Sequence, residues 1–126
     1  MNAPIEKTPN TVKCIGMETV IGAPDLTIDH VMQARSRIAP YVHDTPILTS
    51  TYLNERIGAE LFFKCENFQK AGAFKVRGAC NSVFGLTDED AIHGVATHSS
   101  GNHALSLSYA AGRRGIPCHV VMPKTA

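Results

Sequence analysis

Apolar strand candidates alternate with helix candidates between residues 61 and 122, and this alternation constrains the fold more than any other feature of the chain. The strand candidates are 61–65, 94–97 and 118–122, and the helix candidates are 74–85 and 101–114. Strand–helix–strand units bring successive strands into parallel pairing through right-handed crossovers. The sequence therefore predicts an α/β fold with an open parallel, Rossmann-like sheet and flanking helices.

Turn and cap residues define the elements that precede this region. Thr27 is an N-cap candidate and Pro40 is a helix breaker, and the apolar residues between them follow helical spacing, so a helix is expected there. The other short elements expected are an extended piece at 46–48, a helix at 52–57 and a capped turn at 87–90.

The first part of the chain lacks such signals. Residues 1–24 contain three prolines and two glycines with little periodicity, so we expect a disordered extension there. Folding signals begin after it, which leaves 25–126 as the folded part. A total of 126 residues predicts one domain or part of one, and a hydrophobic content of 44% is enough to build a core.

Charge and apolar content argue against several classes of partner. Twelve basic and eleven acidic residues give a formal net charge of +1, which offers no electrostatic reason to expect nucleic acid or an anionic membrane. No apolar run is long enough for a transmembrane helix, and no secretory signal is visible at the N-terminus. We therefore expect a cytoplasmic location.

The cysteines and histidines show no ligand pattern. Cys14, Cys65, Cys80 and Cys118 form no C-x-x-C pair, so reduced thiols are expected, with a disulfide framework as the alternative because their number is even. The six histidines contain neither an H-E-x-x-H motif nor a paired Cys/His ligand set. No metal site is therefore expected.

Lys75 lies at the expected start of helix 74–85, within the run AFKVRGA. An amine forms an imine with an aldehyde only in its neutral form, which desolvation and the positive end of a helix both favour. Phe74 supplies apolar cover, and Arg77, two positions further on, is expected to point elsewhere. The alternative interpretation is an ordinary solvated lysine on an amphipathic helix.

A second polar segment, THSSGNHA at 97–104, lies between a strand candidate and a helix candidate. Free backbone N–H groups at a helix start bind anions, and Gly101 allows a ligand to approach the backbone closely. The side chains of Ser99, Ser100 and Asn102 add hydrogen-bond donors. The segment therefore suits a carboxylate, and the alternative is an ordinary N-cap made by Ser99 or Ser100.

Five segments carry a resemblance to a known family. They are TPILTS at 45–50, LFFKCENFQ at 61–69, AFKVRGA at 73–79, THSSGNH at 97–103 and GIPCHVVMP at 115–123. In this order and spacing, they resemble the fold type II pyridoxal phosphate enzymes, in the serine racemase and serine/threonine dehydratase (threonine ammonia-lyase) branch. The resemblance implies the tryptophan synthase β-like fold, with 25–126 as the N-terminal part of the catalytic domain, including most of the small domain.

The resemblance also implies a role for each matched position. Lys75 would carry pyridoxal 5′-phosphate as a Schiff base and would act as the base on one face of the cofactor. Asn102 would hydrogen-bond the phenolic oxygen of the cofactor, and Phe74 would pack beside its ring. The substrate carboxylate would be held by Ser99, Ser100, Gly101, Asn102 and His103.

Ser100 bears on the type of reaction. Racemases of this family carry a serine here as the acid/base on the opposite face, whereas many biosynthetic threonine dehydratases carry alanine. The resemblance leaves racemisation and β-elimination both open, on hydroxy amino acids such as serine, threonine or 3-hydroxyaspartate. The implied partner is a small amino-acid substrate, in a homodimer or in a pair with a full-length subunit.

Several parts of the family's site have no counterpart in the sequence. The resemblance places the glycine-rich loop for the cofactor phosphate, the group that faces the pyridine nitrogen and the divalent-metal ligands beyond Ala126. We therefore expect an N-terminal fragment with poor affinity for the cofactor. The alternative to an active lyase or isomerase is a truncated non-catalytic remnant, or a subunit fragment, of such an enzyme.

Overall fold

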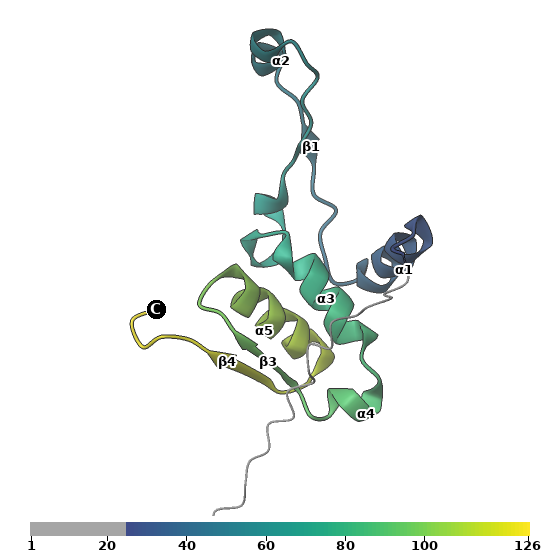
Figure 1. Cartoon of the computed structure of the whole chain (residues 1–126), viewed down its shortest axis with the longest axis vertical. Coiled ribbons are helices and arrows are strands. Elements are labelled where there is room, and N and C mark those ends of the chain that lie inside the picture. The colour runs from purple at the N-terminus through teal and green to yellow at the C-terminus, as the bar shows by residue number, and fades with distance from the viewer. Residues whose placement is uncertain (1–24) are drawn as a thin grey trace, which may run out of the picture.

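The computed structural model describes residues 25–126, in which two helices lie side by side and one of them also packs against a small parallel sheet (Figure 1). The elements in chain order are α1 (Ile28–Ile38), β1 (Ile47–Leu48), α2 (Thr51–Ile57), β2 (Phe63–Lys64), two 3₁₀ turns (Glu66–Phe68 and Lys70–Gly72), α3 (Lys75–Gly85), α4 (Asp88–Ala91), β3 (Val95–His98), α5 (Asn102–Arg114) and β4 (Cys118–Val121). The predicted extension at 1–24 lies outside the described residues.

Most predicted helix boundaries are confirmed. Thr27 caps α1, and a capping box joins it to His30, whose backbone N–H donates to the threonine side chain. Gly58 and Gly115 end α2 and α5 with φ angles of +72° and +75°, the left-handed conformation that glycine adopts without strain. The capped turn expected at 87–90 is the start of α4.

The two strands β3 and β4 pair in parallel, as predicted, with a register that runs from Val95 opposite Cys118 to His98 opposite Val121. Their start requires a glycine at position 94, where φ is +74° and an added Cβ would lie 2.5 Å from the carbonyl oxygen of Pro117. Helix α5 packs against this sheet. The exposed residues of the two strands are Ala96, His98, His119 and Val121.

The predicted strand 61–65 is wrong in its extent and in its partner. Only β2 is extended there, and it pairs antiparallel with β1, with Ile47 opposite Lys64. The connection 49–62, which contains α2, folds the chain back so that β2 meets β1, and pairing with this nearer segment costs less closure entropy than pairing with a more distant strand. A strand of a parallel sheet must also be buried on both faces, whereas β2 is exposed.

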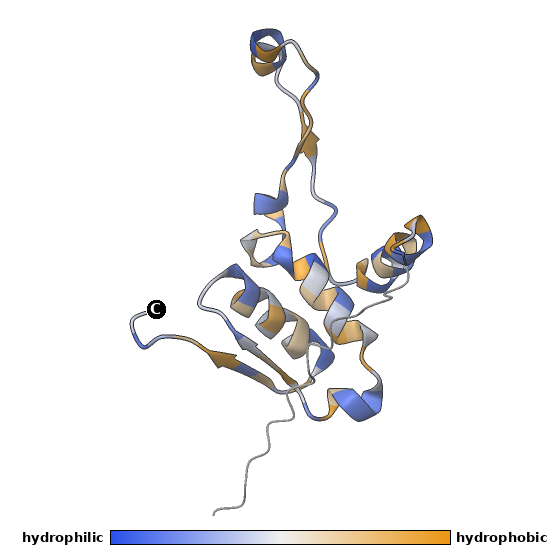
Figure 2. Cartoon of the chain, viewed as in Figure 1, coloured by the Kyte–Doolittle hydropathy of each residue, from blue (hydrophilic) through white to orange (hydrophobic). Residues whose placement is uncertain are grey.

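An arm formed by β1, α2 and β2 projects away from the rest of the described chain (Figure 1). Figure 2 shows strongly apolar residues along it. The large apolar side chains that it exposes are Ile47, Leu48, Tyr52, Leu53, Ile57, Phe62 and Phe63. An apolar surface of this extent is characteristic of an interaction site.

The core lies between α3 and α5, and it confirms the predicted apolar face of α3. The buried residues of this cluster are Ile38, Val76, Ala79, Cys80, Val83, Leu107 and Ala110. Cys65, Cys80 and Cys118 are free thiols, and Cys14 lies outside the described residues. Within 25–126, no helix has the length and the apolar character needed to cross a membrane.

Candidate active site

The first turns of α3 and α5 lie at the same end of the helix pair (Figure 1). Both helices run in the same direction, because β3 returns the chain from the end of α3 to the start of α5. The 3₁₀ turn Lys70–Gly72, directly before α3, contacts α5. The fold therefore brings Lys75 and the loop 99–103 to the same end of the α3–α5 pair, although 24 positions separate Lys75 from Ser99.

Lys75 is the first residue of α3, and its side chain is exposed. Its ammonium nitrogen lies 5.7 Å from the centroid of the Phe74 ring, within the range of a cation–π contact. Phe74 itself is 62% exposed, so it offers an apolar surface beside the amine at the edge of the protein. A flat aromatic ligand bound to Lys75 could pack against this ring.

Hydrogen bonds fix the first residue of the loop 99–103, and the residues that follow it are exposed to solvent. The backbone N–H of Ser99 donates to the carbonyl of Val121 at 3.1 Å, and the N–H of Gly101 donates to the hydroxyl of Ser99 at 3.3 Å. Residues Ser100 to His103 are exposed. The loop therefore has a fixed origin at the end of β3 and presents its side chains to solvent.

The start of α5 has free hydrogen-bond donors. Its N-cap is Gly101, so the alternative in which Ser99 or Ser100 caps the helix is wrong. Among residues 25–126, the backbone N–H groups of 102–104 have no acceptor. Unsatisfied N–H groups at a helix start, beside the side chains of Ser100 and Asn102, are a donor set that fits an anionic oxygen. These residues therefore fit a carboxylate or a phenolate.

A cavity of about 1030 Å³ extends from His103 at the start of α5 to Leu86, Asp90 and His93, near the opposite end of α3. His103 and Leu107 of α5 line it together with Gly78 and Ser82 of α3 and Ala96 of β3. Gly78 and Ser82 follow Lys75 by one and two helical turns, so the cavity runs along the same side of α3. Of the residues predicted for the site, His103 is the one that lines this cavity.

A polar network behind Lys75 was not predicted from the sequence. Arg77 donates two hydrogen bonds to Glu66, from Nε to Oε2 at 2.8 Å and from Nη2 to Oε1 at 2.7 Å. The hydroxyl of Thr45 donates to the same carboxylate at 2.6 Å. Arg77 thus points to Glu66, in agreement with the expectation that it points elsewhere than Lys75. The sequence signal that could have indicated this pair is a glutamate in the polar loop just before a helix that carries an arginine.

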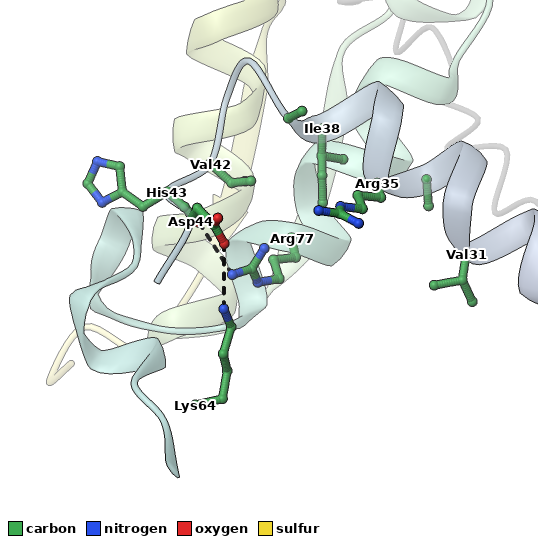
Figure 3. Close-up of a pocket in the computed structure, with 10 residues that line it drawn as sticks. Val31, Arg35, Ile38, Val42, His43, Asp44, Lys64 and Arg77 are labelled. Atoms are coloured by element: carbon green, nitrogen blue, oxygen red, sulfur yellow. Dashed lines mark hydrogen bonds and ion pairs between the residues drawn. The ribbon is translucent and has the colours of Figure 1, made fainter. Parts of the chain in front are cut away.

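The same network fixes the segment before β1. Gln69 is buried, donates to the carbonyl of His43 at 2.8 Å and accepts from the His43 N–H at 2.7 Å. Arg77 also reaches the His43 carbonyl at 3.3 Å, and Lys64 pairs with Asp44 at 3.7 Å (Figure 3). These contacts join three segments that are distant in the sequence.

A second cavity, of about 550 Å³, lies between α1 and this network (Figure 3). Val31, Ile38 and Val42 form an apolar side, and Lys64 and Arg77 form a cationic side. None of the residues predicted for the site lines this cavity. It is therefore a separate feature from the start of α3, where Lys75 lies.

The pKa of Glu66 is lowered from 4.5 to about 2, first by the hydrogen bond from Arg77 and further by the Thr45 hydroxyl, against the opposing effect of burial. The pKa of Arg77 is raised by the same hydrogen bond. A carboxylate with a lowered pKa stabilises the fold at all pH values above its unfolded pKa, and this contribution is lost as the pH falls through the folded value.

We therefore expect acid to weaken the fold between pH 4.5 and pH 2 through Glu66. The shift corresponds to roughly 3 kcal/mol, which partial solvent exposure of both side chains reduces to about 1–2 kcal/mol. Urea unfolding across this pH range should show that the free energy of unfolding falls by this amount in the wild type and not in Glu66→Gln. The matched control is Asp88→Asn, which removes the exposed Asp88–Arg114 pair and should leave the loss in place. An unchanged pH dependence in Glu66→Gln would contradict the assignment.

Comparisons with known proteins show the family to which the chain belongs. A model of the pyridoxal-phosphate dependent enzyme family matches residues 38–126. The chain belongs to this family. Membership implies pyridoxal phosphate as the cofactor of the whole enzyme, and it confirms the expected fold class, of which residues 25–126 form an α/β part.

Individual relatives show which members of the family the chain resembles. The chain is 67% identical to the β-hydroxyaspartate dehydratase of Paracoccus denitrificans over 79% of its own length and 32% of the relative's length. It is 58% identical to the serine racemase of Oryza sativa subsp. indica over 79% of its own length and 29% of the relative's length. The structure of maize serine racemase superposes with a TM-score of 0.74 at 59% identity, over 77% of this chain and 30% of that one. The chain thus spans about a third of the length of these relatives.

Proposed function

We propose that the chain forms one wall of the active site of a pyridoxal phosphate-dependent dehydratase or racemase that acts on hydroxy amino acids. The observation that carries the proposal is the common position of Lys75 and the uncapped start of α5 at one end of the helix pair. An amine that can bind an aldehyde and a set of N–H donors that can bind a carboxylate are two parts that such a site needs. The dehydratase and racemase relatives support the reaction class.

Each residue of the site has a distinct task in this proposal. Lys75 holds the cofactor through its amine, and later removes the α-proton of the substrate. Asn102 donates to the phenolic oxygen of the cofactor, and Phe74 packs beside the ring. When bound, pyridoxal phosphate supplies an electron sink for the electrons left by the departing α-proton. The residues that hold the substrate carboxylate are Ser99, Ser100, Gly101, Asn102 and His103.

The substrates proposed are serine, threonine and 3-hydroxyaspartate, each of which carries a β-hydroxyl group. Loss of that hydroxyl after removal of the α-proton is elimination, and return of a proton to the opposite face is racemisation. Ser100 is the residue proposed to give the proton on the face opposite Lys75. The cytoplasmic location, the homodimer and the absence of nucleic-acid and membrane partners remain predictions.

Trapping of the cofactor tests the proposal on the chain itself. The amine of Lys75 forms a C–N bond with the aldehyde carbon, the aldehyde oxygen leaves as water, and borohydride then adds hydride to the resulting C=N bond. Mass mapping of the pyridoxyl label after incubation with pyridoxal phosphate should place it mainly on Lys75. Lys70 and Lys124 serve as internal controls for unselective labelling. Equal labelling of the three lysines would overturn the proposal.

The exposed apolar arm favours a second candidate. Its seven large apolar residues are 37–68% exposed in the structure of residues 25–126. A non-catalytic remnant or subunit fragment that pairs with a full-length subunit of the same family would cover such a surface. Sedimentation of the chain mixed with the Paracoccus dehydratase would detect that pairing. A stable mixed complex, together with equal pyridoxyl labelling of Lys75, Lys70 and Lys124, would favour this second candidate over the first.

A further inference from the structure

The first turn of α3 has no local anchor of the usual kind. Its N-cap is Phe74, and within the described chain no side chain caps the helix there. Helix ends without a cap are free to fray. The turn before it is also strained, because Ala71 has a φ of +58°, which costs a residue with a Cβ roughly 1 kcal/mol or more. Other contacts must therefore hold the segment that carries Lys75.

Two sets of contacts are present: Val76, which is fully buried, packs in the core between α3 and α5, and Arg77 bonds to Glu66, which also accepts from Thr45. Arg77 follows Lys75 by two residues, so the two side chains leave the same helical turn on different sides. The planar guanidinium meets the carboxylate with two parallel hydrogen bonds, which restrict rotation as well as distance. Thr45, only 4% exposed, adds a third bond to the carboxylate from a different segment. The Arg77–Glu66 pair therefore restrains the position and rotation of the first turn on the side away from Lys75, in addition to the packing of Val76.

We propose that Glu66 and Arg77 are positioning residues that hold the first turn of α3, so that the amine of Lys75 is presented at the end of the α3–α5 pair where the 99–103 loop leads into α5. The inference rests on the proposed role of Lys75 in binding an aldehyde. Neither residue touches the reacting atoms in this proposal. Their effect passes through the backbone of residues 75–77, and an error of about 1 Å in such a placement can cost a hundredfold in rate.

The experiment measures label selectivity in the 126-residue chain, with pyridoxal phosphate as the aldehyde and borohydride as the trap. We expect Glu66→Gln to lower the ratio of label on Lys75 to label on Lys70 by about ten- to a hundredfold. Arg77→Met should lower it at least as much, because it also removes the bond to the His43 carbonyl, and the double variant should lower it by less than the product of the two single effects, because both variants remove the Glu66–Arg77 pair. Asp88→Asn removes the ion pair between the exposed Asp88 of α4 and Arg114 of α5, and it should leave the ratio unchanged.

A positioning role is separated from general stability in two ways. Labelling is carried out at a temperature at which the circular dichroism of every variant is that of the folded chain, and hydrogen exchange should rise at the amides of 76–78 and not in α5. If Glu66→Gln does not fold, Thr45→Val removes one bond to the same carboxylate and should give a smaller loss of selectivity. A folded Glu66→Gln chain with wild-type selectivity overturns the inference. Unselective labelling of the wild type overturns the proposed function instead, and exchange at 76–78 then decides whether the pair holds the turn.

Discussion

Replacement of Lys75 by alanine is expected to abolish catalysis in a complete enzyme that carries this sequence. Such an enzyme can be made by placing residues 25–126 in the matched segment of the Paracoccus dehydratase, which is 67% identical. The variant loses both the amine that holds the cofactor and the base that removes the α-proton. Loss of a general base alone lowers rates by about 10²–10⁴-fold, and loss of the covalent link adds to this.

The measurement is the rate of keto-acid release from 3-hydroxyaspartate and from serine. The matched control is Lys70→Ala, which removes an amine from the turn just before α3 and should keep the parent rate. The first turn of α3 should persist in Lys75→Ala, because Glu66 and Arg77 hold it from the other side. A Lys75→Ala chimaera that retained more than about one-hundredth of the parent rate would contradict the proposed role.

Replacement of Ser100 by alanine is expected to separate the two reactions. Racemisation requires a proton donor on the face opposite Lys75, and removal of that donor should lower the racemisation of serine by about 10²–10⁴-fold. Elimination needs no proton on that face and should fall much less. The smaller decrease in the elimination rate reflects the loss of one hydrogen-bond donor to the substrate carboxylate. The free N–H groups of 102–104 still bind that carboxylate.

The readout is the ratio of D-serine to pyruvate formed by the same chimaera from L-serine. Ser108→Ala is the matched control, since Ser108 is an exposed serine on α5 whose contact is the sulfur of Cys118 at 3.8 Å. An unaltered product ratio in Ser100→Ala would show that another group delivers the proton. If the parent forms no D-serine at all, the enzyme is a dehydratase, and the role of Ser100 is then confined to binding the carboxylate.

The sequence predicted the helices well because caps, end glycines and apolar periodicity all lie within the helices or a few residues from their ends. Thr27 and Gly115 mark helix ends through bonds and dihedral angles within a few residues, and the buried face of α3 follows from its periodicity. The strand at 61–65 was predicted wrongly because its partner is not a local property. An apolar run does not reveal whether it pairs with β1 or with a distant strand.

Some features of the candidate site were also visible in the sequence, whereas others required the structure. Residue types beside helix starts made Lys75 and the loop 99–103 candidates, and the resemblance to a known family assigned them roles. The pairing of Glu66 with Arg77 was not, because a carboxylate in a polar loop has no periodicity and 11 positions separate it from its partner. The absence of a side-chain cap on α5 also needed the structure, since two serines before a glycine are equally compatible with a capped helix start.

By itself, the sequence determined the positions of the helices, the parallel β3–β4 crossover and the residues that identify the family, because each depends on neighbours within one or two elements. Only the tertiary structure decided which helix starts lie together, where the chain leaves N–H groups free and what holds the turn that carries Lys75. Those features depend on contacts between segments that meet only when α3 packs on α5. Their energies come from burial and from hydrogen bonds between distant residues, which no local pattern encodes.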